Sequence, residues 1–380
     1  MDFELSEEQK LLRRNVREFT EAEIKPVARE LDETGRYPRA ILKKAAALGL
    51  TGITVAERYG GAGMDHVSYA IAIEEIARAC ASTAVILSVH NSLYCGAIEH
   101  FGTEEQKQRL LAPFARGEKI GAYALSEPQA GSNAAALTTR AVRRGDRYIV
   151  NGTKAWVTSG EAAEAAVVFV STQPEKGQKG ITALVIEKGA AGFSVGREEK
   201  KLGVHATACC GLAFTDCEVP VANRLGDEGQ GYKIALTTLD SGRVGIAAQA
   251  IGIAQGALDA ALAYAHERRA FGRPIADLQA IQFMLADMAT EIEAARLLAW
   301  RAAWKHDSGA RFSKEAAMAK LFASEMASRV THRAMQIHGA NGYSTEYPVE
   351  RAYRDARVTE IYEGTSEIQR LVIASWALRG

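Results

Sequence analysis

A carboxylate beside a glycine near the end of the chain is the first residue that could do chemistry. Glu363 precedes Gly364 and a helix start at which Ser366 and Gln369 have the spacing of a capping box. Glycine lets a ligand approach the backbone closely, and the positive end of a helix favours a nearby negative group. Glu363 is therefore a candidate catalytic base, and a solvated loop carboxylate is the alternative that the spacing leaves open.

Residues 361–369, which read I-Y-E-G-T-S-E-I-Q, resemble the C-terminal signature of the acyl-CoA dehydrogenases. The resemblance extends over essentially the whole chain and is closest to the short-chain (butyryl-CoA) branch. It implies that Glu363 removes the α-proton of an acyl thioester while the β-hydrogen passes as hydride to N5 of FAD, giving a trans-2-enoyl-CoA. The Glu363 N–H and a ribityl hydroxyl of FAD would bind the thioester carbonyl as it gains charge. Burial should raise the pKa of Glu363.

Two segments in the middle of the chain resemble the family's flavin-binding strands. On composition alone, residues 123–133 would more often form a turn than a site, and Trp156 with Thr158 would more often be a packed pair. Asn133 stands where the family usually has Asp. The resemblance implies FAD contacts, and for Ser132 also an acyl-CoA contact, from Tyr123, Leu125, Ser126, Gly131, Ser132, Trp156, Val157 and Thr158.

Two later motifs resemble FAD-binding segments that reach across subunits. Residues 268–274 fit R-x-x-F-G-x-P, and residues 336–343 fit Q-I-x-G-G-x-G-Y with Ala340 in place of the second glycine. An arginine fork suits a pyrophosphate. The resemblance implies a homotetramer, a dimer of dimers with shared FAD sites, in which FAD is contacted by Arg268, Phe271, Gln279, Gln336, Gly339 and Ala340, and also by Thr365 and Glu367.

Asp240 and Arg243 stand three residues apart on a predicted helix and so share one face. An exposed ion pair worth roughly 0.3–0.5 kcal/mol is one interpretation. The resemblance implies instead that they bind the CoA portion of the substrate, with Tyr362 and Gly364 as further substrate contacts. Residues 84–93 should line the acyl pocket, where Ile86 and Leu87 favour butyryl- to hexanoyl-CoA.

An electron-transfer flavoprotein is the electron acceptor that the resemblance implies. Branched-chain or glutaryl-type specificity, an acyl-CoA oxidase, a flavin monooxygenase and a non-catalytic binding protein remain alternatives. His205 stands where the family usually has Arg, and we expect His90, His266 and His332 to be structural, with no metal site.

Composition excludes several partners. The net charge of +0, from 46 basic and 46 acidic residues, indicates no nucleic-acid surface. The N-terminus resembles neither a secretion signal nor a transit peptide, and no apolar run suggests a membrane span. We expect a bacterial cytoplasmic protein, or a mitochondrial matrix protein whose presequence has been removed. Packing in reduced form is expected for the cysteines, which are Cys80, Cys95, Cys209, Cys210 and Cys217.

The elements that must position these residues fall into three parts. We predict an N-terminal α-helical domain (1–119), a middle β domain (120–228) and a C-terminal four-helix bundle (229–380), an α+β multi-layer fold. Short β-rich runs without intervening helices predict an antiparallel, barrel-like sheet, with turns at Gly145-Asp146 and Asn151-Gly152. Predicted helix starts include Ser6, Asp65 and Thr103.

Overall fold

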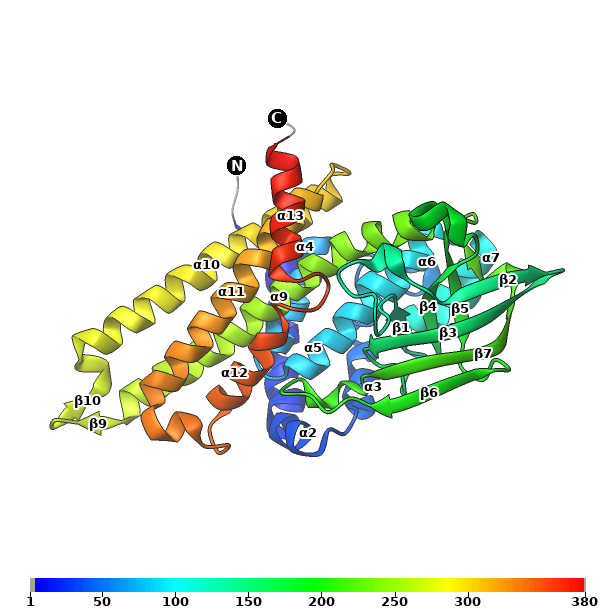
Figure 1. Ribbon diagram of the computed structural model, residues 1–380. Coiled ribbons are helices and arrows are strands. Elements are labelled where there is room, and N and C mark those ends of the chain that lie inside the picture. Colours follow the sequence, from blue (N-terminus) through cyan, green and yellow to red (C-terminus); the bar gives the residue numbers. More distant parts are fainter. Residues whose placement is uncertain (1–3, 379–380) are drawn as a thin grey trace.

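The computed structural model describes residues 4–378 and confirms the predicted order of helices, sheet and helices (Figure 1). Residues 1–3 and 379–380 of the predicted outer domains lie outside the described residues. The predicted domain boundaries themselves stay predictions. In Figure 1 the sheet lies at one end of the molecule and the β9–β10 hairpin at the other, with the long helix α9 running between them.

The first part consists of helices whose starts follow the predicted caps. Ser6 and Gln9 form a reciprocal capping box, as do Thr103 and Gln106, and the Asp65 carboxylate accepts from the N–H of Ser68. Several π-helical and 3₁₀ turns join the helices. The helices are α1 (Glu7–Phe19), α2 (Ala28–Thr34), α3 (Arg39–Ala47), α4 (His66–Ala77), α5 (Ala81–Ser88), α6 (Gly96–Phe101), α7 (Glu104–Gln106) and α8 (Ala112–Ala115).

The middle part is an eight-stranded sheet in the order β6-β7-β3-β2-β4-β5-β8, with β1 paired to β4. Its strands are β1 (Gly121–Ala124), β2 (Arg140–Arg144), β3 (Arg147–Val157), β4 (Ala165–Ser171), β5 (Ile181–Glu187), β6 (Phe193–Glu198), β7 (Cys210–Pro220) and β8 (Arg224–Leu225). Most pairs are antiparallel, as predicted, but β1 runs parallel to β4. The described sheet does not close between β6 and β8, so barrel-like describes it only loosely.

One predicted turn lies inside a strand. Asn151 and Gly152 belong to β3, which continues to Val157 and pairs with β7 on both sides of a register shift. The φ of Gly152 is 144°, and a Cβ there would lie 2.6 Å from the Thr139 hydroxyl. The glycine therefore permits a bulge and a close neighbour rather than a reversal. The other predicted turn, at Gly145-Asp146, does join β2 to β3.

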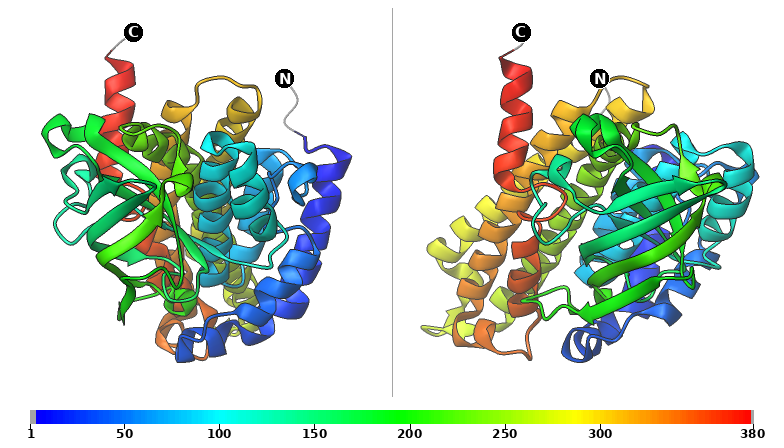
Figure 2. Two further views of the ribbon diagram at one scale, coloured as in Figure 1. Left: turned by 90° about the vertical axis from the view of Figure 1, so that its right-hand side faces the viewer. Right: turned by 45° about the vertical axis from the view of Figure 1, so that its right-hand side comes forward.

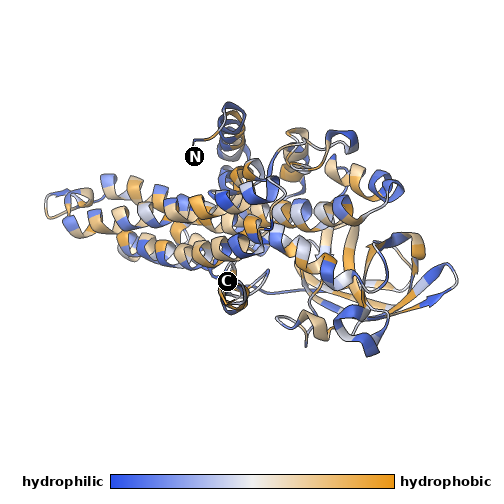
Figure 3. Ribbon diagram, turned by 90° about the horizontal axis from the view of Figure 1, so that it is seen from above, coloured by the Kyte–Doolittle hydropathy of each residue, from blue (hydrophilic) through white to orange (hydrophobic). Residues whose placement is uncertain are grey.

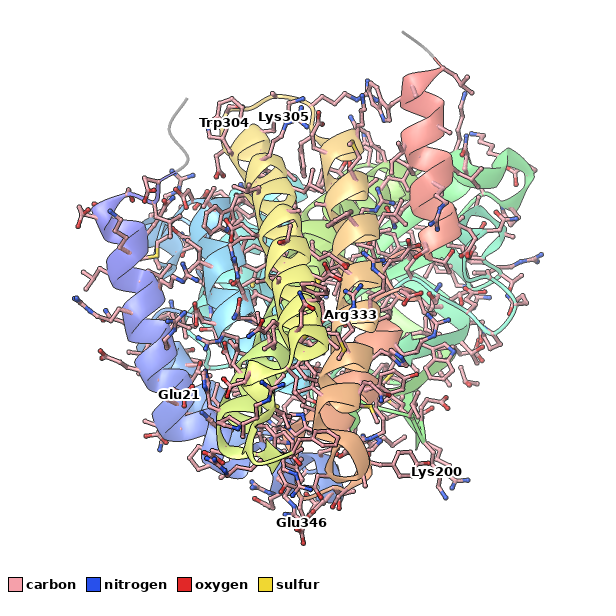
Figure 4. The ribbon with its side chains drawn as sticks, turned by 90° about the vertical axis from the view of Figure 1, so that its left-hand side faces the viewer. Glu21, Lys200, Trp304, Lys305, Arg333 and Glu346 are labelled. Atoms are coloured by element: carbon pink, nitrogen blue, oxygen red, sulfur yellow. The ribbon has the colours of Figure 1, made fainter. Side chains whose placement is uncertain are left out.

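The third part contains the long helices α9 (Gly231–Glu267), α10 (Gln279–Asp307) and α11 (Ser313–His338), with α12 (Pro348–Val358) and α13 (Ser366–Ala377) beside α11. A short hairpin of β9 (Arg269–Ala270) and β10 (Arg273–Pro274) joins α9 to α10. Ion pairs link the outer faces of α10 and α11, where Arg333 binds Glu291 at 2.6 Å (Figure 4).

Helix α9 is also packed against α4, which brings the first and third parts together. Contrary to expectation, α9 is long and apolar enough to cross a membrane by length and composition, but 67% of its most apolar stretch is buried inside the fold. Hydrophobic and hydrophilic residues alternate in bands along the bundle helices (Figure 3). The apolar character of α9 is thus explained by burial in the core.

The sheet lies beside the helices of the first part (Figure 2). The chain crosses from one to the other at Gly117, where a Cβ would lie 2.3 Å from the Cβ of Ala46 in α3. Strand β4 is buried on both faces: Val167 and Phe169 pack toward the helices, whereas Val168 and Val170 pack within the sheet's own core. This accounts for its continuous apolar sequence. Before α13, the chain passes the meeting point of sheet, α9 and α11.

Candidate active site

Glu363 lies in the loop between α12 and α13 and has an unusual environment. The residue as a whole is partly exposed, but both carboxylate oxygens are buried and have no hydrogen-bond partner among residues 4–378. Burial, which disfavours the charged form, raises the pKa of Glu363 to about 7, against the opposing charges of Lys320 and Arg243. A buried carboxyl with free oxygens is chemically available and titrates near neutrality.

Helix α9 forms the wall beside this carboxyl. A Cβ built on Gly242 would lie 2.1 Å from Glu363 Oε2 and 2.8 Å from Leu93 Cδ2, so only glycine leaves room there. Two turns further on, Gln249 accepts a hydrogen bond from the Tyr362 hydroxyl. Burial raises the pKa of Tyr362 well above its usual value, so it remains a neutral donor.

The loop backbone is held in a rarely populated conformation. Glu363 has φ of 51° and Gly364 has φ of 96°. The Gly364 carbonyl accepts from Lys320 Nζ at 2.7 Å and from Gln369 Nε2 at 2.9 Å. Two side chains from different helices therefore hold the turn that carries Glu363.

The predicted helix cap at this point is wrong by one residue. Thr365, not Ser366, is the N-cap of α13, and its hydroxyl accepts from the N–H of Ile368. Gln369 does not complete a capping box, because its amide donates to Gly364 instead. The buried Ser366 hydroxyl and Gln369 Oε1 have no partner among the described residues, so polar atoms remain free beside the loop.

Asp240 and Arg243 form the predicted pair, at 2.7 Å, but the pair is largely buried rather than exposed. The other oxygen of Asp240 accepts from the Ser313 hydroxyl, and burial raises the pKa of Asp240. Arg243 Nε is buried without a partner in the described part of the chain. A free buried N–H and an acidic neighbour suit recognition of a polar ligand.

The predicted flavin strands end near this loop. The Tyr123 side chain points into the core, where its hydroxyl lies 3.1 Å from that of Thr238 on α9, so any cofactor contact would come from its backbone. Val157 is likewise buried, whereas Trp156 is 61% exposed with φ of 58°. Gly131 and Ser132 are exposed, and Leu125, Ser126 and Thr158 are half-buried.

A buried ion pair joins the two strands. Lys154 of β3 donates to Glu127 at 2.7 Å, and both side chains are at most 1% exposed. Burial acts to raise the pKa of Glu127, but the Lys154 charge and further hydrogen bonds outweigh it and hold that pKa at about 2. The N–H of Ala155 also donates to Ser126. The segment after β1 is thus fixed against β3.

Most of the other predicted FAD residues lie at the far end of the fold, whereas Thr365 and Glu367 lie at the start of α13, beside the Glu363 loop. Arg268 and Phe271 belong to the β9–β10 hairpin region, at the opposite end of α9 from the sheet (Figure 1). Gln279 starts α10, and Gln336 and Gly339 end α11. Phe271 is 92% exposed. One chain therefore does not bring the two groups together.

Ala340 does not obstruct this second group. It lies in a 3₁₀ turn and is not among the described residues with positive φ, whereas Gly339 has φ of 61°. A Cβ is compatible with ordinary backbone conformation at position 340. The departure from the family motif therefore requires no backbone strain.

His205 and His90 have structural partners. Both ring nitrogens of His205 lie 2.9 Å from backbone oxygens, those of Asp32 and Lys201. His90 is buried, which lowers its pKa to about 4, and its Nδ1 accepts from the N–H of Gly121. His266 and His332 are exposed, without a described role.

One group of potential metal ligands comes together that the sequence did not reveal. Ligand atoms of His66, His306 and Asp307 lie within 4.8 Å of one another. The Asp307 carboxylate accepts from His66 Nδ1 at 2.8 Å and from the His66 N–H at 3.0 Å. These bonds tie the start of α4 to the end of α10. We interpret the group as a link between the two helices.

Two supporting residues, Lys320 and Gln249, were missed from the sequence, and Gln369 was predicted beside the loop but in a capping box that the structure does not have. Lys320 carried a signal, because it interrupts the alanine stripe of α11 formed by Ala316, Ala319, Ala323 and Ala327. A lysine at a buried helical position is almost always paired with an acceptor or an acid. Gln249 gave no comparable signal.

Comparisons with known proteins identify the family and the fold. The family models for the acyl-CoA dehydrogenase N-terminal, middle and C-terminal domains match residues 6–118, 122–217 and 229–378. The mitochondrial short-chain specific acyl-CoA dehydrogenase of Mus musculus is 54% identical over 376 residues, covering 99% of this chain and 91% of the relative.

Two solved structures superpose over the whole chain. Butyryl-CoA dehydrogenase from Megasphaera elsdenii is 45% identical with a TM-score of 0.98, covering 100% of both chains. A chain from structural work on the electron transferring flavoprotein of Acidaminococcus fermentans and flavin-based electron bifurcation is 48% identical with a TM-score of 0.99, again covering 100% of both.

The chain belongs to the acyl-CoA dehydrogenase family. It is an enzyme that dehydrogenates acyl-CoA, and its cofactor is FAD. The described residues fit this cofactor, because buried polar atoms of Ser366 and Gln369, just after the Glu363 loop, have no hydrogen-bond partner among them. No Cβ contact within 4 Å would arise at Gly131, which leaves space at the sheet side.

Proposed function

We propose that this enzyme converts short-chain acyl-CoA to trans-2-enoyl-CoA, with Glu363 as the base that takes the α-proton. The observation that carries the proposal is the Glu363 carboxyl, buried and without a hydrogen-bond partner among the described residues, with a pKa of about 7. A base whose pKa lies near the working pH combines a useful ionised fraction with useful basicity.

The chain's other residues bind and orient. The backbone N–H of Glu363 would donate to the thioester carbonyl, where negative charge develops as the α-proton leaves. Asp240 and Arg243 would bind the CoA portion from α9, together with Ser132 from the sheet side. Tyr362 and Gly364 would contact the substrate from the base's own loop.

FAD, when bound, supplies the hydride acceptor at N5. Its flavin would rest against Leu125, Ser126, Gly131, Ser132, Trp156 and Thr158, and against the backbone of Tyr123 and Val157. Thr365 and Glu367 would bind it at the start of α13, where helical N–H groups favour an anion. Arg268, Phe271, Gln279, Gln336, Gly339 and Ala340 lie too far away in the same chain, which supports a site completed by a neighbouring subunit.

The partners follow from the same likeness. A homotetramer, as a dimer of dimers, would supply the second half of each FAD site. An electron-transfer flavoprotein would take the electrons, a proposal supported by the similar chain from the Acidaminococcus fermentans work. Mitochondrial and bacterial relatives both exist, so either compartment fits. Short-chain preference is supported by Leu93, from the proposed acyl-pocket segment, which lies against Gly242.

Anaerobic bleaching of the flavin by butyryl-CoA tests the proposal. We expect Glu363→Gln to keep FAD and to bind butyryl-CoA, but to lose bleaching, because the amide cannot accept the α-proton. Normal bleaching by this variant would refute the assignment. In wild type, kcat/KM should peak at about four to six carbons, since Leu93 of the proposed acyl-pocket segment lies against Gly242 and would limit the room for the acyl chain. A maximum at about twelve carbons would contradict the short-chain preference. Rapid oxygen uptake without an acceptor would instead indicate an oxidase.

A further inference from the structure

Lys320 is a buried cation that packing does not explain. It lies in α11 with 0% exposure, among alanines on the buried face of the helix. Burying an ammonium costs several kcal/mol unless it is hydrogen-bonded or paired. Burial indeed lowers the pKa of Lys320, to about 8, so the side chain is still mainly charged at pH 7. Its position therefore requires a specific partner.

The hydrogen-bond acceptor of Lys320 and the acid that acts on it most strongly both belong to the loop that carries the base. Its ammonium donates to the Gly364 carbonyl at 2.7 Å. Glu363 is the acid whose charge most favours the protonated lysine, ahead of Glu360 and Glu367. Reciprocally, Lys320 is the cation that most favours the ionised form of Glu363, ahead of Arg243.

The ammonium acts on Glu363 without a hydrogen bond to its carboxylate. Both carboxylate oxygens are free of partners within residues 4–378. A direct ion pair would lower the basicity of Glu363 strongly and occupy a lone pair that must receive the α-proton. By binding the next carbonyl, Lys320 favours ionisation through its field alone and leaves the oxygens available.

The same hydrogen bond supports a strained turn. Glu363 is not a glycine, yet its φ is 51°, a conformation that is unfavourable for residues with a Cβ. Lys320 and Gln369 both bind the carbonyl that follows. The orientation of the carboxyl toward Gly242 therefore depends on these two side chains.

We propose that Lys320 is a positioning residue that holds the turn at Glu363 and Gly364 and keeps the Glu363 carboxyl substantially ionised near neutral pH. The inference rests on the proposed role of Glu363 as base. The other titratable groups that feel Glu363 are Tyr69 of α4, Tyr123 of β1, Tyr362 of the loop and Arg243 of α9, and the three tyrosines are neutral near pH 7.

The test is the pH dependence of kcat/KM in holoenzyme carrying Lys320→Met, which removes the charge and keeps most of the volume. We expect the acidic limb, near pH 7 in wild type, to move upward by about one unit, a roughly tenfold loss below the limb. Lys320→Arg, which retains a cation, should restore the wild-type limb. Lys233→Met, at an exposed lysine of α9, controls for loss of a charge.

An acidic limb that stays in place in Lys320→Met overturns the proposal, whatever happens to the rate. If that variant does not retain FAD, Lys320→Gln, which keeps an N–H donor without the charge, carries the same test. A second readout is the infrared carbonyl band of the protonated Glu363 carboxyl, identified by its absence in Glu363→Gln and titrated without turnover; it should persist to higher pH in the charge-free variants. Normal bleaching by Glu363→Gln would instead refute the role of Glu363 as base. Failure of the Lys320 proposal and failure of the proposed function therefore give different results.

Discussion

The Glu363 carboxyl makes protein stability depend on pH. Its folded pKa, about 7, lies above its ordinary value of 4.5, so the folded state binds more protons than the unfolded chain between these pH values. Stability that is present below pH 4.5 is therefore lost as pH rises through 7. At about 1.36 kcal/mol per unit, the ionised carboxyl costs about 3 kcal/mol at high pH.

We accordingly expect Glu363→Gln, whose amide never ionises, to be more stable than wild type at pH 8. The stability difference should shrink as pH falls toward 5, because the wild-type carboxyl is then protonated. Thermal unfolding of the two holoenzymes at both pH values measures this change. An equal difference in Tm at the two pH values would show that the carboxyl is not desolvated in the folded protein.

Sequence reasoning located Glu363 from its own motif, and the structure places that residue where a buried base would be useful. It did not identify what holds the residue. Thr365 rather than Ser366 caps α13, because neighbouring hydroxyl residues are equally good caps and only the helix register decides. The Gln369 and Lys320 contacts with Gly364 depend on the approach of different segments, which spacing along one helix cannot show.

At the level of elements, two glycines of α9 make room for different neighbours. A Cβ at Gly242 would meet the Glu363 carboxyl at 2.1 Å, whereas a Cβ at Gly252 would meet the backbone oxygen of Glu74 at 2.2 Å. We expect Gly242→Ala to lower kcat/KM by about 10²-fold, since it displaces a catalytic group by about 1 Å. Its Tm should fall less than that of Gly252→Ala, because the atoms that its Cβ meets, Glu363 Oε2 and Leu93 Cδ2, are side-chain ends rather than backbone.

Gly252→Ala is the matched substitution on the same helix. Its clash is with the backbone of a packed helix, so we expect a loss of about 1–3 kcal/mol of stability with kcat/KM of the folded enzyme retained. Steady-state kinetics and thermal unfolding of both holoenzymes measure the contrast. Equal effects of the two substitutions on activity would mean that Gly242 serves only helix packing.

Element prediction succeeded where local chemistry determines the outcome. The caps at Ser6, Asp65 and Thr103 depend on side chains within one turn, and the structure has all three. The Asn151-Gly152 turn failed because the same dipeptide accommodates a bulge when a strand pairs on both sides, as β3 does with β2 and β7. Parallel pairing of β1 with β4 depends on strand order, which no local pattern encodes.

At the level of the whole molecule, the two predicted halves of the FAD site lie at opposite ends of α9 (Figure 1). A shared site predicts complementation between inactive subunits. Arg268→Ala and Glu363→Gln should each be inactive alone, but their co-expressed mixture should recover about a quarter of wild-type activity. Half of randomly formed dimers are mixed, and in each mixed dimer one of two sites has both native residues.

Activity and FAD content of the purified mixture check this result. Arg269→Ala, beside Arg268 but bound to the Gly272 carbonyl, is the control and should keep FAD and activity. If the mixture is as inactive as the two separate variants, both halves of each FAD site come from one chain and the site is not shared. The sequence indicated such sharing only through family resemblance, because a single chain's pattern does not show which copy supplies a residue.

The length of α9 has a geometric consequence for any variant of this protein. From Arg243 near the base to Arg268 at the hairpin, an unbroken helix rises by about 1.5 Å and rotates by about 100° per residue. One added or deleted residue would therefore swing the hairpin to another side of the bundle. The number of residues in this span therefore sets both the distance and the direction of the hairpin relative to Arg243.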